Sequence, residues 1–106
     1  MTTTELTMLE GVSDSIARAI DTATPSQLAA ASPCVGWSAR DVLNHMIGGA
    51  DLFTACARGE QQPFPDWSDM PDWVGNDPAA SYRRAAAGIF AAFSAPGVLE
   101  GTVPMP

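Results

Sequence analysis

The sequence predicts an all-α fold, an up-down helical bundle with three long helices present of an expected four. Three stretches carry apolar residues at intervals of three and four, the spacing of an amphipathic helix. Residues typical of helix starts and stops stand at their ends. The chain has 106 residues, of which 46% are hydrophobic, enough for one core and too few for two. We therefore expect a single domain over residues 1–106.

The first helix is expected over residues 4–24. Its apolar face consists of Leu6, Leu9, Val12, Ile16, Ile20 and Ala23. Its polar face consists of Glu10, Asp14, Arg18 and Asp21. Pro25 then interrupts the chain, and residues 27–31 are expected to form a short turn of helix.

The central helix is expected over residues 38–59. Ser38 followed by Asp41 fits a capping box, with the carboxylate in place of the usual Glu or Gln. At about 100° per residue, one broad apolar arc forms. This arc contains Val42, Leu43, Met46, Ile47, Ala50 and Phe53, and the opposite side contains Arg40, Asn44, Asp51 and Arg58. Gly48 and Gly49 each cost about 1 kcal/mol of helix propensity, which indicates close packing at that point.

Residues 61–77 are expected to form an irregular loop, because three prolines and Gly75 exclude a regular element. The loop repeats Pro-Asp-Trp and contains Phe64, Trp67 and Trp73. These aromatic residues either cap the open end of a bundle or form a lid or pocket wall, since long loops are often functional. The aspartates at 66, 69 and 72 lack the spacing of a calcium loop.

The last helix is expected from Asp77 and Pro78 to residue 95, where Pro96 and Gly97 end it. Its apolar stripe consists of Tyr82, Ala86, Ile89, Phe90 and Phe93. Three such helices form either a closed three-helix bundle or three quarters of a four-helix bundle. The remaining tail resembles the start of an extended connection, which favours the second arrangement. We then expect a bare groove lined by some of Leu9, Ile16, Met46, Phe53, Ile89 and Phe93.

Composition excludes several function classes. The net charge of −7 opposes binding to nucleic acids and to anionic membranes. No stretch is apolar over the roughly 20 residues that a membrane span needs, and the N-terminus lacks a signal-peptide pattern. We expect a cytoplasmic protein with reduced thiols. Cys34 and Cys56 lie too far apart for a Cys-x-x-Cys motif.

The candidate site centres on His45, the only histidine, at the border between the two sides of the central helix. Asp41, one turn earlier, is within reach of the same ion, but its expected role is to cap the helix with Ser38. Cys34 has no second histidine to deprotonate it, and we expect a small buried residue. Trp37 is expected to pack at the helix entry. Arg83 and Arg84 are expected to be solvated, unless one faces a carboxylate of the irregular loop.

The segment from Ser32 to His45, SPCVGWSARDVLNH, resembles the DinB-like metal-binding bundles of actinobacterial type. It is most similar to the N-terminal domain of mycothiol-dependent maleylpyruvate isomerases. The resemblance implies a four-helix bundle that holds a divalent metal, zinc or nickel, by three side chains. His45 corresponds to one ligand. The other two, a carboxylate and a histidine four residues apart on the last helix, match no position here.

From this resemblance we expect a truncated DinB-like domain, part of a thiol-dependent isomerase or transferase that acts on a small molecule. The thiol implied is mycothiol. We expect the reading frame to continue into the missing helix, and this chain alone to bind metal weakly and to be inactive. The alternative is a non-enzymatic helical module that forms a homodimer through its exposed apolar face.

Overall fold

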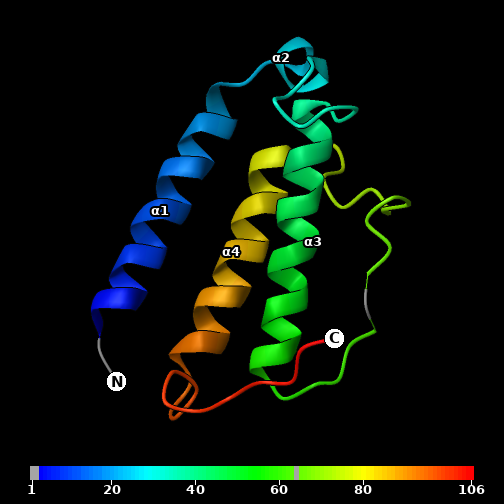
Figure 1. The fold of residues 1–106 in the computed structure, drawn as a ribbon. Helices are drawn as coiled ribbons and strands as arrows, with labels where there is room; N and C mark the ends of the chain where they lie inside the picture. Colours follow the sequence, from blue (N-terminus) through cyan, green and yellow to red (C-terminus); the bar gives the residue numbers. More distant parts are fainter. Residues whose placement is uncertain (1–2, 64) are drawn as a thin grey trace.

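The computed structural model describes residues 3–63 and 65–106 and is all-helical, as predicted. It contains α1 (Thr3–Thr22), α2 (Pro25–Ala29), α3 (Ala39–Ala57) and α4 (Pro78–Ser94). Figure 1 shows α4 between α1 and α3, and α2 above the start of α3. Helix α4 packs against both long helices, whereas α1 and α3 do not pack against each other. None of the described helices has the length and hydropathy needed to cross a membrane.

The long helices do not alternate in direction throughout. Helix α1 runs opposite to the other two, while α3 and α4 run parallel (Figure 1). Two contacts fix the parallel register, since Arg84 pairs with Asp51 and Gly88 lies beside Thr54 further along both helices. A parallel pair needs a connection that returns along the full length of a helix. The irregular loop is that connection, which explains its length.

The predicted helix starts are confirmed by their caps. The Asp41 N–H donates to Ser38 Oγ at 3.1 Å, and the Ser38 N–H donates to Asp41 Oδ2 at 2.9 Å. Asp77 accepts from the Ala80 N–H at 3.1 Å, with Pro78 in the first turn. The short helix begins earlier than predicted, because Thr24 forms a second capping box and Pro25 opens the helix instead of interrupting the chain.

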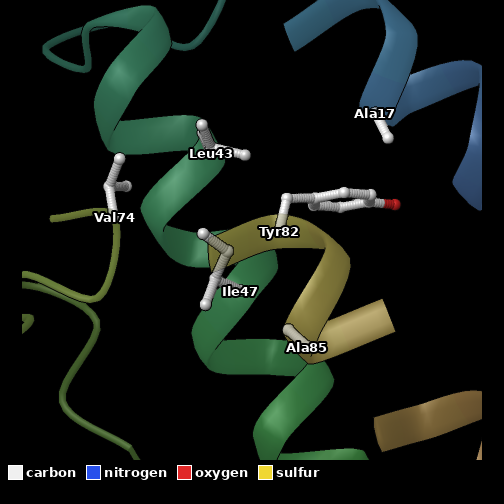
Figure 2. Close-up of a cluster of buried hydrophobic side chains, with 6 residues drawn as sticks. All are labelled: Ala17, Leu43, Ile47, Val74, Tyr82 and Ala85. Carbon is white, nitrogen blue, oxygen red and sulfur yellow. The ribbon is translucent and has the colours of Figure 1, made fainter. Parts of the chain in front are cut away.

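The core lies where the three long helices and the loop meet. It consists of Ala17, Leu43, Ile47, Val74, Tyr82 and Ala85 (Figure 2). Tyr82 reaches from α4 towards Ala17 of α1, and Val74 approaches α3 from the loop. Val12, predicted on the apolar face of α1, is 57% exposed instead. The reason is that α1 has one helical neighbour, which covers only part of a wide apolar arc.

Asn44 corrects the prediction for the polar side of the central helix. The helical wheel placed it on the side opposite the apolar arc, but it is buried with 8% of its surface exposed. Burial of an amide is tolerated where hydrogen bonds satisfy it, and here the loop supplies all of them. This side of α3 is therefore a docking surface for the loop and not a solvated face.

Candidate functional site

His45 stands in a row of four aromatic rings. Its ring centroid lies 5.3 Å from that of Trp37 and 4.3 Å from that of Trp67, with the Trp67 ring edge-on at 72°. Trp67 in turn lies 6.5 Å from Trp73 at 68°. Trp37 therefore packs at the helix entry, as predicted, and the ring it contacts is that of His45. Of the aromatic residues of the loop, Trp67 lies beside His45 and Trp73 lies next to Trp67, while Phe64 is outside the described residues.

The Nδ1 atom of His45 is buried and has no hydrogen-bond partner. Among the described residues it is the one buried side-chain nitrogen or oxygen in that condition. A buried polar atom without a partner costs about 1–3 kcal/mol, so it normally marks strain or an unfilled site. Among the described residues, the imidazole is thus the side chain whose buried nitrogen has an open position for a hydrogen-bond or ligand partner.

The loop is fixed to α3 by residues spaced four apart, which form one stripe on the helix. Arg40 donates to Asp72 at 3.1 Å and to the Gly75 carbonyl at 3.0 Å. Asn44 donates to the Pro71 carbonyl at 2.7 Å. It also accepts from the backbone N–H groups of Trp73 and Val74, at 2.7 and 3.2 Å. Together these bonds hold residues 71–75 against the helix.

Gly48 completes this stripe. A Cβ at that position would lie 2.3 Å from Cζ3 of Trp73, so only glycine lets the indole approach so closely. The prediction of close packing at this helical turn is confirmed for Gly48. It is wrong for Gly49, where nothing lies within 4 Å of an added Cβ.

An apolar groove lies on the other side of His45, between α1 and α3, and α4 forms its floor. Its volume is ≈ 330 Å³. It is lined by Leu9, Ser13, His45, Met46, Gly49, Ala50, Phe53, Tyr82, Ala86 and Ile89. A second hollow of ≈ 280 Å³ shares Leu9, Phe53 and Ile89 with it and adds Phe93. Of the residues predicted to line a bare groove, Ile16 alone does not, because it packs against the core.

The described residues do not complete a metal site. They contain no cluster of three His, Cys, Asp or Glu side chains that could hold an ion. Asp41 is engaged in the capping box, as expected, and Cys56 is fully buried on α3. Tightly bound zinc needs three or four converging ligands. The described residues therefore place no full set of metal donors around His45.

Cys34 is exposed, so its predicted burial is wrong. It lies in a loop that projects from an isolated bridge between Ala31 and Ser38. The Trp37 N–H closes a tight turn onto the Cys34 carbonyl at 3.0 Å, and Gly36 takes a φ of +83° within it. The next residue, Val35, is 100% exposed. A loop this short has no interior in which to bury the thiol.

The arginines of α4 join the helices instead of facing the irregular loop. Arg83 forms two hydrogen bonds with Asp21 of α1, at 3.0 and 2.6 Å. Arg84 does the same with Asp51 of α3, at 3.1 and 3.2 Å. These hydrogen bonds lower the pKa of Asp21 and raise the pKa of both arginines. Both pairs are half-exposed, so they orient the helices more than they stabilise them.

The chain matches a known protein family over most of its length. The family model of the mycothiol maleylpyruvate isomerase N-terminal domain matches residues 9–97. This span includes most of α1, all of α2, α3 and α4, and the intervening loop. Searches of curated proteins and of solved structures found no significant match.

Proposed function

Because the chain belongs to the mycothiol maleylpyruvate isomerase N-terminal domain family, we propose that it contributes His45 as one ligand of a divalent metal site. The metal would be zinc or nickel, and the site would serve a thiol-dependent isomerase or transferase with mycothiol as the thiol. The buried, unpartnered Nδ1 of His45 is the observation that carries this proposal. We also propose that the protein is cytoplasmic and of actinobacterial type.

The donor set does not fit a metal held by this chain alone, since no second and third ligand converge on His45 in the described residues. We infer that the missing donors belong to a helix that packs into the apolar groove. The groove reaches His45, and its lining is almost wholly apolar, as the inner face of a bundle helix requires. By itself the chain should therefore bind metal weakly and catalyse no reaction.

Metal titration tests this proposal. Co²⁺ serves as a visible probe for a zinc site, and binding is followed by its absorption in wild type and in His45→Ala. We expect weak binding by the wild type, well under one equivalent after dialysis, and a further loss in His45→Ala. Asp69→Asn is a control for the loss of a loop carboxylate, because Asp69 is exposed on the irregular loop. Binding that His45→Ala leaves unchanged would overturn the assignment of this ligand.

A second function, a non-enzymatic module that dimerises through the groove, is favoured by the apolar side chains left in solvent. Phe53 is 42% exposed at the groove, and Met8 and Val12 are 64% and 57% exposed on α1. Burial of apolar surface contributes about 25 cal/mol per Å² before association costs. Light scattering should then show dimers that Phe53→Glu dissociates. A monodisperse monomer at high protein concentration would exclude this function.

A further inference from the structure

A third hollow lies on the loop side of α3 and shares no residue with the groove. Its volume is ≈ 250 Å³. The helix contributes Gly48, Asp51 and Leu52, and the loop contributes Gln62, Pro63, Pro65, Trp67 and Trp73. We call it the indole cleft, after the two tryptophans. Figure 1 shows the loop running beside α3 over this stretch.

We propose that the indole cleft binds a small organic cation of the quaternary or methylated ammonium class. Two half-buried indole rings line it, with centroids 6.5 Å apart and planes at 68°. A cation is attracted to an indole when it lies over the face of the ring, within about 6 Å of the ring centroid. At the observed separation one ammonium group is able to lie within that distance of both rings at once.

The charges around the indole cleft favour a cation over an anion. Among the described residues that line it there is no Lys, Arg or His, and there is one carboxylate, Asp51. Asp51 is paired with Arg84, so it contributes a modest attraction and keeps the rim from being positive. The net charge of −7 attracts cations to the whole molecule. The main attraction therefore comes from the indole rings.

The position of the indoles is built into the fold. Trp73 is held by its backbone bond to Asn44 and by its seat on Gly48, and Trp67 is held edge-on to His45. A binding wall that is ordered before the ligand arrives loses little conformational entropy on binding. Rings placed only to fill a core would be covered, but here both retain exposed surface in a hollow.

The test compares choline with 3,3-dimethylbutan-1-ol, which has the same shape and no charge. Binding is measured by tryptophan fluorescence and by ligand-observed NMR, in buffer with a chelator so that the proposed metal site plays no part. We expect choline to bind at least about fivefold more tightly than its neutral isostere, in line with one or two cation–π contacts. Equal affinities would overturn the proposal, as would the absence of choline binding.

Variants at Trp67 locate the site. Choline affinity should fall in the order Trp67, Trp67→Phe, Trp67→Leu, because indole attracts cations more strongly than phenyl and leucine has no ring. Trp37→Phe is the matched control, since Trp37 contacts His45 but does not line the cleft. Far-ultraviolet circular dichroism checks that each variant is folded. A Trp67 series without any change in choline affinity, in folded variants, would refute this site.

Discussion

Replacing each of the two adjacent glycines of α3 by alanine should stabilise the protein at Gly49 and not at Gly48. Alanine is favoured over glycine in a helix by about 1 kcal/mol. At Gly49 an added methyl meets nothing within 4 Å, so Gly49→Ala should gain up to that amount. At Gly48 the methyl would lie 2.3, 2.7 and 2.8 Å from three ring carbons of Trp73.

The indole of Trp73 has little freedom to give way to that methyl. Carbon atoms in contact lie about 3.5–4.0 Å apart, so the ring would have to move by about 1 Å. Its backbone N–H is held by Asn44 at 2.7 Å, and Trp67 lies beside the ring. Overpacking of this kind costs about 1–3 kcal/mol, which offsets or exceeds the gain in helix propensity. Gly48→Ala should therefore be neutral to about 2 kcal/mol destabilising.

Urea denaturation followed by far-ultraviolet circular dichroism measures both variants against wild type. The expected gap between them is about 1–3 kcal/mol, or several degrees in Tm for a domain of this size. The near-ultraviolet signal of the tryptophans should change in Gly48→Ala and not in Gly49→Ala. Equal stabilisation of the two variants would mean that Trp73 does not pack on Gly48.

Three further predictions concern the loop and the thiols. Asn44→Ala should lower the free energy of unfolding by about 2–4 kcal/mol in urea denaturation, because the N–H groups of Trp73 and Val74 lose their acceptor. Asn44→Asp keeps that acceptor, so it should weaken the near-ultraviolet signal less than Asn44→Ala does. The Gly75 N–H and Arg40 lower the pKa of Asp72 from its ordinary value of 3.8. The contribution of Asp72 to the free energy of unfolding is therefore present above pH 3.8 and is lost as the pH falls through the folded-state pKa. Asp72→Asn should make stability less dependent on pH in this acid range. Cys34 should react with a thiol reagent in the native state and Cys56 only after unfolding, and equal rates would contradict the burial of Cys56.

The elements that local sequence determines were predictable. Helix starts depend on neighbours within three residues, so the sequence alone predicts the caps at Ser38 and Asp77 that the structure contains. The apolar arcs of the three long helices likewise predict that they pack into a bundle. The bounds differ by one or two residues at most ends, as expected for frayed termini.

The contacts of the irregular loop were not predictable from periodicity. A helical wheel places Asn44 on the polar side of the helix, whereas in the structure it is buried and bonded to the loop backbone. One signal was available, since a proline-rich loop that buries Val74 must find partners for its own N–H groups. Val74 itself is an isolated apolar residue outside any helical period, so periodicity does not predict its burial. Cys34 was misplaced because residue type alone favours burial of cysteine.

Helix α3 has three faces with different neighbours, and His45 lies where two of them meet. Leu43 and Ile47 face the core, while Met46 and Phe53 line the apolar groove. The stripe of Arg40, Asn44 and Gly48 carries the loop. His45 lies between the last two faces, in contact with Trp67 of the loop and lining the groove. A helix that entered the groove and engaged the imidazole would therefore act on the ring that touches Trp67, and through it on the indole cleft. We predict that choline and the metal change each other's affinity by the same factor, as linkage requires.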